Sequence, residues 1–531
     1  MACSRRLWQS RRHSGEMQGL PTRRSSHPPT RRELGLIACL LAALISPGCR
    51  KAADAGVVKD HLTIGLSLPK LSPNEVSADR VSGTMKLEAA VAVAQDGKPA
   101  KRIFDEWSWI EHGHALELHL QPKILFHDGT PLTAELAADI LRAYLTSPDQ
   151  THISSVDTVT ATDAAHVVIR TTRQEGLLLS DLSMIDFELP GKPGVGTGPF
   201  RATDDPTAVD AFDKYYLGAP VLKHVKISEY PSQRAAWTAM MRGEIDMLHE
   251  VSPEASEFVE RESSVRSTTF LRPYYNAIAF NLNHPVLSQR EVRLALNEAI
   301  DRQAIVDVSM RGLGKPAAGP IWPQFWAYSS AVPGFSFDPL SAATRLEALG
   351  LVNGGERQPG RMPSRFSFKC LVLENEPVFN RIALRVQRQL YEIGVDMEVV
   401  SLPLRPLLGA IYTGNFDAAL MEFIGSRSLN WAYIFWHSPG PGFASPLPSG
   451  YKAADAALDR FRAATDEAEI KASVEGMQRI FRDEPPAIFL AWQERSRALS
   501  KAFEIPDESS GDILGTIRQW RGVPLAGQSA K

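Results

Sequence analysis

The sequence predicts an α/β fold made of two related lobes. Strand and helix signals alternate from the end of the amino-terminal leader to the end of the chain, without low-complexity tracts. Two segments, 221–248 and 395–420, repeat one order of strand, helix and strand. A chain of 531 residues with 44% hydrophobic content can fill more than one core, so a multi-domain globular protein is expected.

The amino-terminal leader is expected to be an export signal. Residues 1–48 hold eight Arg, two Glu and an apolar run, Leu34 to Ile45, that is too short to span a bilayer. The whole chain has a net charge of -3. Removal of residues 1–48 takes away six net positive charges, so the remaining chain has a net charge of -9. Such an acidic mature chain is a poor candidate for binding nucleic acid.

The residues around the end of the leader leave its processing open. Cys49, in "SPGC", resembles the lipidated cysteine of bacterial lipoproteins, which implies a membrane anchor by lipid alone. The alternative is a cut after Ala55 that yields a soluble exported protein. The start codon (Met1 or Met17) and the Sec or twin-arginine route also stay open. Only Cys370 remains in the body of the chain, so no internal disulfide is expected.

The individual elements follow from local patterns. "HLTIGLSLP", from His61, is expected to be a strand, and 115–130 is expected to be a pair of strands with a turn. Thr133 is expected to begin a helix. In each repeated segment, a glycine suited to a left-handed C-cap ends the helix and an Asp enters the next strand: Gly243 and Asp246, then Gly414 and Asp417.

A helix between the two repeated segments is predicted from 288 onward. Ser288 and Glu291 have the spacing of a capping box, and apolar residues follow at helical period. The arginines of this helix are expected to form a solvated face.

Five ordered blocks carry a resemblance to a known family: "FHDGTPLTAEL", "GTGPF", "MRGEIDML", "IAFNLNHPVLSQREVRLALNEAIDRQAI" and "IGVDMEVVSL". They resemble extracellular solute-binding proteins of family 5, the peptide, dipeptide and nickel binding components of ABC importers. The resemblance implies a type II periplasmic binding protein: two α/β lobes joined by hinge strands, with an extra subdomain on the first lobe. It places the hinge near 270–276 and a second crossing near 486–497. Its implied domains are 1–48 signal peptide, 49–75 and 188–270 lobe I, 76–187 extra subdomain, 271–490 lobe II, and 491–531 return to lobe I.

The function implied by the resemblance is capture of a solute between closing lobes and its delivery to a membrane permease. The protein is then expected to be a periplasmic or envelope monomer without enzymatic activity, cofactor or metal. The alternative is an envelope sensor with the same fold, and a neighbouring permease gene would distinguish the two.

Motifs suggestive of chemistry have simpler structural explanations. His127 and Asp128 are expected to form a turn relieved by Gly129, because no nucleophile motif accompanies them. The "SLPK" segment lacks a K-T-G partner, and His112 and His114 lack a third metal ligand.

The predicted binding region follows the strand "FDAALMEF", because ligands of open α/β sheets bind beyond the carboxyl ends of strands. Aromatic side chains supply large contact areas in such pockets. The candidate ligand-binding residues are Trp431, Trp436, Tyr433, Glu422, Arg427, Tyr275, Asn276 and Trp322.

Peptide receptors of the family place an Asp in this region, where it pairs with the peptide's ammonium group. The corresponding stretch here, "EFIGSRSLNWAYIFW", contains no Asp. Since a buried ammonium without a carboxylate is costly, di- and tripeptides are expected to bind weakly, and Trp431 or Trp436 is expected to stack on a flat or sugar-like ligand face.

Overall fold

A computed structural model describes residues 58–67, 77–147, 155–252, 255, 258–259, 261–352, 354, 364–440, 445–506 and 512–524. These residues fall within one compact unit, Val58–Gly527. The predicted leader and Cys49 lie outside the described residues. Within the described ranges, no helix is both long enough and apolar enough to cross a bilayer.

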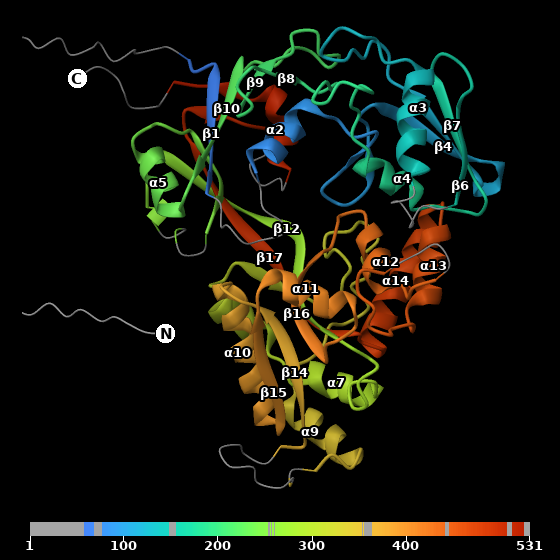
Figure 1. The fold of residues 1–531 in the computed structure, drawn as a ribbon, viewed down its shortest axis with the longest axis vertical. Coiled ribbons are helices and arrows are strands. Elements are labelled where there is room, and N and C mark those ends of the chain that lie inside the picture. The colour runs from blue at the N-terminus through green and yellow to red at the C-terminus, as the bar shows by residue number, and fades with distance from the viewer. Residues whose placement is uncertain are drawn as a thin grey trace, which may run out of the picture. The chain divides into compact units, whose positions relative to one another are not determined.

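One large mixed sheet organises the described part of the chain (Figure 1). Its spatial order is β15 (Val395–Leu402), β14 (Phe366–Leu373), β16 (Ala418–Ile424), β12 (Val265–Phe280), β17 (Ala487–Ser500), β11 (Met247–Val251), β1 (His61–Ser67), β10 (His224–Tyr230), β9 (Ala208–Ala211) and β8 (Phe200–Ala202), with β13 (Gly314–Pro316) paired to β17 off this path. We call the side from β11 to β8 lobe I and the side from β16 to β15 lobe II.

Strands β12 and β17 join the two lobes. They are 16 and 14 residues long and pair antiparallel, with a register shift between Leu271 and Tyr275. The end of β12 pairs with β16 in lobe II, whereas the end of β17 pairs with β11 in lobe I. Two crossing strands between α/β lobes confirm the predicted fold class.

Lobe I is built on parallel pairing of β1 with β10 and β11. Helix α2 (Ala78–Lys86) covers one face, and α5 (Gln233–Met241) packs against Leu248 on the other. The last described segment also belongs to the α2 side, because Ile517 and Trp520 share a core with Leu62. That segment contains the 3-10 helix η5 (Ile513–Gln519) and strand β19 (Arg521–Gly522), which pairs with β18 (Phe503–Glu504) of the preceding segment.

The repeated segments occupy matching places in the two lobes. Gly243 and Gly414 end their helices with φ values of 71° and 70°, as predicted. The Asp246 carboxylate accepts from the Thr63 backbone N–H on β1 at 2.9 Å, and the Asp417 carboxylate accepts from the Lys369 N–H on β14 at 2.9 Å. Each Asp therefore ties its strand to the neighbouring parallel strand.

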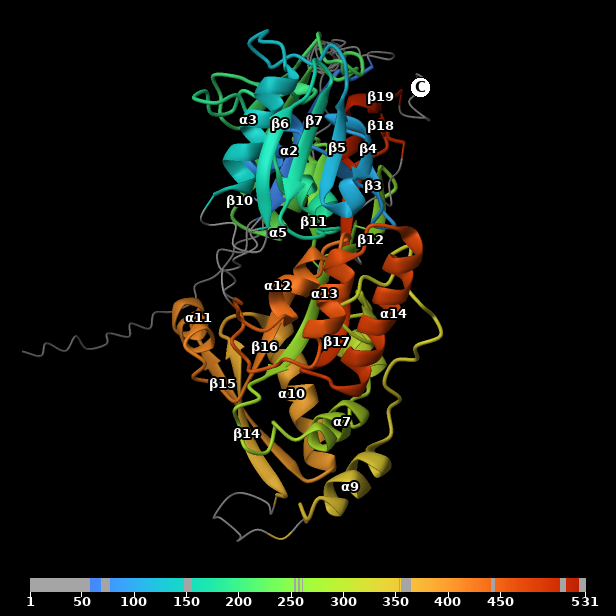
Figure 2. The same ribbon diagram turned by 90° about the vertical axis from the view of Figure 1, so that its right-hand side faces the viewer.

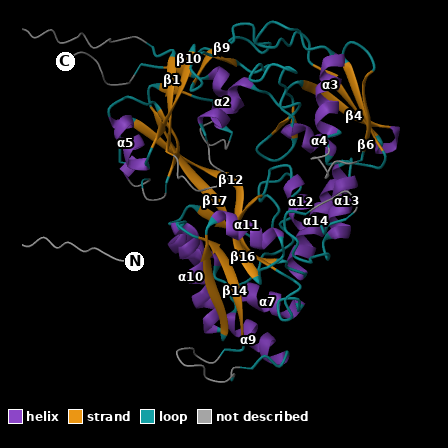
Figure 3. Cartoon of the chain, viewed as in Figure 1, coloured by secondary structure: helices purple, strands orange, loops and turns teal. Residues whose placement is uncertain are grey.

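Helices cover both faces of the lobe II strands (Figure 3). One face packs against α7 (Arg290–Glu298), α9 (Pro339–Ala348) and α10 (Pro377–Glu392). The other packs against α11 (Leu404–Tyr412), α12 (Asn430–Trp436), α13 (Asp455–Ala463) and α14 (Glu467–Asp483). Short α8 (Arg302–Ala304) and the π-helical turn η4 (Ile305–Ser309) follow α7.

A separate antiparallel sheet forms a small-sheet subdomain with its own core, which spans Ala90 to Leu189 (Figure 2). Its order is β4 (Phe104–Ile110), β5 (Ala115–Leu120), β7 (His166–Thr171) and β6 (Val156–Ala161), covered by α3 (Ala134–Leu145). Other elements here are the hairpin β2 (Ala92–Val93) and β3 (Pro99–Ala100), η1 (Glu111–Gly113), α4 (Leu178–Asp181) and η3 (Leu182–Met184). Thr133 caps α3 as predicted, accepting from the Leu136 N–H at 3.2 Å.

The expected strand pair within 115–130 is only half correct. Strand β5 ends at Leu120, and the residues after it make one isolated bridge, Leu125 to Pro131. Two hydrogen bonds flank this bridge, from the Phe126 N–H to the Thr130 carbonyl at 2.8 Å and from the Leu132 N–H to the Ile124 carbonyl at 3.0 Å, so the segment forms a tight turn and not a second strand. Ile124 and Phe126 are still buried in the subdomain core, which explains the strand-like pattern.

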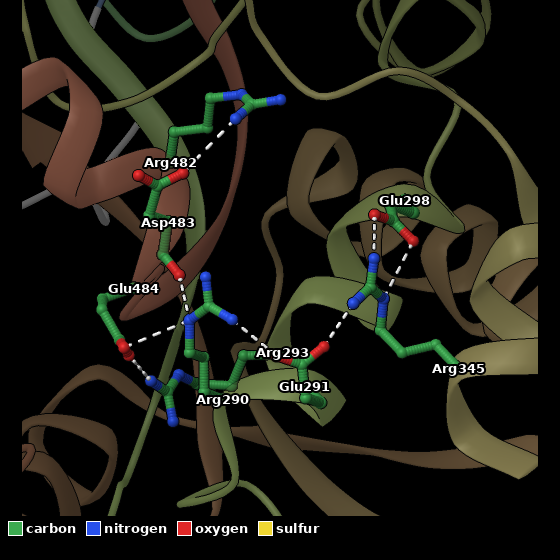
Figure 4. A network of polar contacts seen from close by, with 8 residues as sticks. All are labelled: Arg290, Glu291, Arg293, Glu298, Arg345, Arg482, Asp483 and Glu484. Atoms are coloured by element: carbon green, nitrogen blue, oxygen red, sulfur yellow. Dashed lines mark hydrogen bonds and ion pairs between the residues drawn. The ribbon is translucent and has the colours of Figure 1, made fainter. Parts of the chain in front are cut away.

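The predicted capping box of α7 is wrong, and the predicted solvated arginines are only partly right: Arg290 is exposed, whereas Arg293 is buried. The helix begins at Arg290, so Glu291 comes one position too early for the box, and it binds Arg290 and Arg345 (Figure 4). Arg293 is 3% exposed and donates to the backbone carbonyl of Pro485 at 2.7 Å and to Glu484 at 3.0 Å. These contacts fasten α7 to the connection between α14 and β17.

Candidate functional site

Three of the predicted aromatic ligands pack together in the core of lobe II. Tyr275, Trp322 and Trp436 are each at most 1% exposed. The Trp436 indole N–H donates to the Tyr275 hydroxyl at 2.9 Å, and both rings stack on Phe423 with centroids 5.3 Å apart. Trp492 joins the Trp322 and Tyr275 rings, at 5.3 and 4.9 Å. This burial favours a packing role for the three side chains over the predicted ligand contact.

The polar candidates lie on the opposite face of the sheet. Asn276 and Glu422 are register partners on β12 and β16, and side chains of adjacent strand residues point to opposite faces. Gln493 on β17 donates to both, at 3.0 Å to Asn276 and 2.5 Å to Glu422. Its own side-chain oxygen accepts from Arg272 at 3.4 Å. The crossing strands therefore carry a hydrogen-bonded chain between the lobes.

Charged side chains extend this chain into lobe I. The Glu250 carboxylate, at the end of β11, lies 3.8 Å from the Arg272 guanidinium and 4.0 Å from that of Arg495. Burial lowers the pKa of Arg495, and the positive charge of Arg272 lowers it further. Burial also raises the pKa of Glu376, which precedes α10, and the nearby Glu422 carboxylate adds to the rise. Acidic and basic groups from both lobes thus meet at the crossing.

The position of this cluster is that of a ligand site in open α/β sheets. Glu250 and Glu422 lie near the carboxyl ends of β11 and β16, and Glu376 follows the end of β14. Ligands bind beyond the carboxyl ends of strands. We call Glu250, Arg272, Glu376, Glu422 and Arg495 the crossing cluster.

Four members of the cluster were missed in the sequence, and only Glu422 was a candidate. Arg272 and Arg495 do fall inside the predicted hinge segments, at 270–276 and 486–497, which was an available signal. Glu250 and Glu376 carry no local pattern that separates them from surface acids. Among the described residues, no group of His, Cys, Asp and Glu is arranged to hold a metal.

The remaining candidates lie after β16 and reach toward the small-sheet subdomain. The Arg427 guanidinium donates to the Val93 carbonyl at 3.5 Å, and burial lowers the pKa of Arg427. Trp431 is half-buried, with its ring 5.4 Å from that of Phe435. Tyr433 is 5% exposed, and its hydroxyl accepts from Arg462 at 3.0 Å. The structure does not bring these three residues to the crossing cluster, and Trp431 keeps the most accessible ring among them.

The pair His127 and Asp128 forms a structural turn, as predicted. Gly129 has φ +90°, and the Asp128 carboxylate accepts from the Thr130 N–H at 2.9 Å. A hydrogen bond of 3.0 Å joins the His127 ring to the Gly198 carbonyl, so the turn anchors the "GTGPF" segment.

Known proteins resemble the chain over most of its length. Residues 98–443 match the family described as bacterial extracellular solute-binding proteins, family 5 Middle. The heme-binding protein A of Haemophilus influenzae is 23% identical over 470 residues, covering 69% of this chain and 83% of that protein. The glutathione-binding protein GsiB of Pectobacterium atrosepticum is 22% identical over 512 residues, covering 88% and 95%. The solved structure of the oligopeptide-binding protein AppA of Bacillus subtilis, in complex with a nonapeptide, superposes with a TM-score of 0.68 at 20% identity, covering 88% of this chain and 100% of that one.

Proposed function

Because the chain belongs to the bacterial extracellular solute-binding proteins of family 5, we propose that it captures a small solute between its lobes for delivery to the permease of an ABC importer. The crossing cluster is the observation that supports this role most directly. It joins charged groups of both lobes at the strands that connect them. A solute bound there would contact both lobes at once and favour their closed arrangement.

We propose a polar or charged solute that places an ionic group at the crossing cluster. The two guanidiniums of Arg272 and Arg495 share one carboxylate at 3.8 and 4.0 Å, which are longer than hydrogen-bond distances. Their planar donors suit a carboxylate or phosphate. Trp436 is 1% exposed, which leaves Trp431 as the more accessible of the two tryptophans. Since Trp431 lies away from the crossing cluster, it would contact a part of the solute remote from the ionic group.

Calorimetry on the purified protein tests the binding function. The panel contains glutathione, heme, a nickel–histidine complex, and trialanine with its amino-acetylated form. We expect at least one compound to bind in the micromolar range, and Arg272→Ala and Arg495→Ala to weaken it by about tenfold or more. Asp157→Asn, on an exposed position of β6, is the matched control and should bind like wild type. Unchanged affinity in both arginine variants would remove the crossing cluster from the site.

Trialanine is expected to bind weakly. The stretch after β16 lacks an Asp, and Glu422 already accepts from Gln493 at 2.5 Å. Tight binding of trialanine that acetylation abolishes would mean that another acid, with Glu376 as the first candidate, receives the ammonium group.

We also propose that lipid on Cys49 anchors the mature protein as a monomer, with lobe I, the extra subdomain and lobe II divided at the boundaries predicted from sequence. Cell fractionation tests the anchor: Cys49→Ala should move the protein from the membrane to the soluble periplasmic fraction. A wild-type protein that is already soluble and begins after Ala55 would contradict it.

A further inference from the structure

Lobe I exposes apolar side chains at the amino ends of its strands. Val58, which precedes β1, is 49% exposed, and Val221, which precedes β10, is 54% exposed. Leu217, in the turn before Val221, is 42% exposed. Most large apolar side chains in the described part of lobe I lie instead in its two cores. Exposed apolar groups that gather at one place mark a contact outside the molecule.

Backbone pairing brings Val58 and Val221 together. The parallel pairing of β1 with β10 continues before the first residues of both strands, because the Lys223 N–H donates to the Asp60 carbonyl at 2.6 Å. The same register, followed two residues further toward the amino end, sets Val58 beside Val221.

Arg518 of η5 joins Leu217 and Val221 to the same place. The Val221 N–H donates to the Arg518 carbonyl at 3.4 Å. Gly218, next to Leu217, has φ +96°, and a Cβ atom there would lie 3.6 Å from a guanidinium nitrogen of Arg518. We call Val58, Leu217, Val221 and Arg518 the amino-end face of lobe I.

The charges of this face suit an anionic surface, although the chain after residue 48 has a net charge of -9. The segments that build the face are 58–60, 213–223 and 518–522. Their cations are Lys59, Lys214, Lys223, Arg518 and Arg521, and their anions are Asp60 and Asp213. Lys59 and Arg521 also bind acids outside these segments, Asp246 at 2.6 Å and Glu504 at 2.8 Å. One net positive charge remains when these two acids are included.

The proposed lipid anchor leads directly to this face. Val58 comes nine residues after Cys49, and nine fully extended residues span at most about 30 Å. Arg50 and Lys51 follow Cys49 in the sequence, and basic residues beside a membrane anchor favour anionic lipids. Such a short tether gives the face a high effective concentration at the bilayer, so weak contacts there are populated.

We propose that the amino-end face of lobe I rests on the lipid bilayer, an inference that depends on the proposed lipid anchor at Cys49. The three apolar side chains enter the interfacial region, and the basic side chains beside them contact anionic head groups. Lipid and protein contact together hold a protein at a bilayer more firmly than either does alone. Because three partly exposed side chains bury little area, the face does not retain the protein once Cys49→Ala removes the lipid.

This contact leaves the crossing cluster open to solute. Strands β1 and β11 are parallel, and the amino-end face precedes β1, whereas Glu250 lies near the carboxyl end of β11. The seven residues of β1 separate its two ends by about 23 Å. The bilayer and the crossing cluster therefore lie at opposite ends of the lobe I strands, and solute reaches the site while the face rests on lipid.

Fluorescence quenching by lipid tests the contact on the full-length, lipidated protein. Mass spectrometry first verifies the lipid on Cys49. The protein is then reconstituted into phosphatidylcholine vesicles that contain phosphatidylglycerol and a lipid with a nitroxide on its head group. A fluorophore is attached at Ala219→Cys, between Leu217 and Val221, or at Ala348→Cys on α9 of lobe II, both exposed positions.

The two labels should respond differently. We expect the label at 219 to lose most of its fluorescence and the label at 348 to lose little. Lipid occupies the Cys49 thiol and Cys370 is buried, so neither takes the fluorophore. The α9 position is a demanding control, because Leu340 lines the same groove as Ala348 and is 79% exposed. Apolar exposure is thus present there without the tether.

Paired serine variants locate the contact. Leu217→Ser with Val221→Ser should reduce quenching of the label at 219 to the level of the label at 348. Leu384→Ser with Val308→Ser, which changes side chains of lobe II that are 58% and 54% exposed, should leave quenching at 219 unchanged.

The outcomes separate the anchor from the face. Equal quenching of the two labels in lipidated protein, or full quenching that persists in the Leu217 and Val221 variant, would overturn the contact while the anchor stands. A mature protein without lipid on Cys49 would refute the anchor and the contact together. No solute is used, so failure of the solute-binding function leaves this test unaffected.

Discussion

Asp246 and Asp417 show how one residue can fix a strand in its sheet. Each accepts a backbone N–H from the neighbouring parallel strand, and Asp246 also binds the Lys59 ammonium at 2.6 Å. The two differ in burial: Asp246 is 4% exposed, whereas Asp417 is half-buried. A lost partner costs more where water cannot replace it.

We therefore expect Asp246→Ala to destabilise the protein by about 1–3 kcal/mol and Asp417→Ala to cost less. Urea unfolding measures both. Asp157→Ala, at an exposed position of β6, serves as the control. Its free energy of unfolding should stay within about 0.5 kcal/mol of wild type. Equal losses of stability in Asp246→Ala and Asp157→Ala would contradict a stabilising role for the Asp246 hydrogen bond to β1.

The hydroxyl of Tyr275 makes a buried hydrogen bond whose contribution to stability can be measured. It accepts from the Trp436 indole at 2.9 Å inside a core where Trp436 is 1% exposed, and burial raises the pKa of Tyr275. Tyr275→Phe leaves the indole N–H buried without this acceptor, so we expect a loss of about 1–3 kcal/mol. Tyr391→Phe, at an exposed position of α10, is the matched control. If Tyr275→Phe instead lowers only solute affinity, the aromatic cluster belongs to the binding site.

Among the elements, α7 depends on a buried arginine. Arg293 donates to the backbone carbonyls of Leu287, Ser288 and Pro485. It also donates to the Glu484 carboxylate, a contact drawn in Figure 4. We expect Arg293→Ala to cost about 2–4 kcal/mol in denaturant unfolding. Arg482→Ala, which removes one exposed ion pair at 3.3 Å, should cost less than about 1 kcal/mol. A larger loss of stability in Arg482→Ala than in Arg293→Ala would mean that the exposed ion pair stabilises α7 more than the buried arginine does.

Elements with a local cause could be predicted from the sequence. The glycine C-caps at Gly243 and Gly414 and the cap at Thr133 depend only on neighbours in the chain, and they were correct. The capping box at Ser288 failed by one residue: the helix begins at Arg290, and the Ser288 hydroxyl donates to the Pro285 carbonyl at 3.0 Å and does not cap the helix.

The candidate site was harder to predict for a related reason. Hydrophobic pattern places Trp436 near a strand end, but it cannot tell a ring that lines a pocket from one that fills a core. Glu250, Arg272 and Arg495 come together only because β11, β12 and β17 are neighbours in the sheet. Such long-range pairing leaves no periodic signal in the chain.

At the scale of the whole molecule, two strands connect the lobes, and a solute held by both should draw them together. We expect small-angle scattering to show a smaller radius of gyration when a solute identified by calorimetry is added. Arg272→Ala with the same solute is the control and should show a weaker change. A radius that stays constant at saturating solute would argue against closure.

The position of β17 near the end of the chain determines when lobe I can be completed. Lobe I pairs its β11 with β17 and shares its core with Ile517 and Trp520, so its first strand, β1, has to wait for residues near the carboxyl terminus. During synthesis at about 5–20 residues per second, that wait lasts on the order of half a minute or more. Lobe I therefore cannot complete its fold on the ribosome while the tail is missing. The early strands β1, β10 and β11 can pair with one another, but the edge of β11 and the core around Leu62 stay incomplete until the last part of the chain has been made.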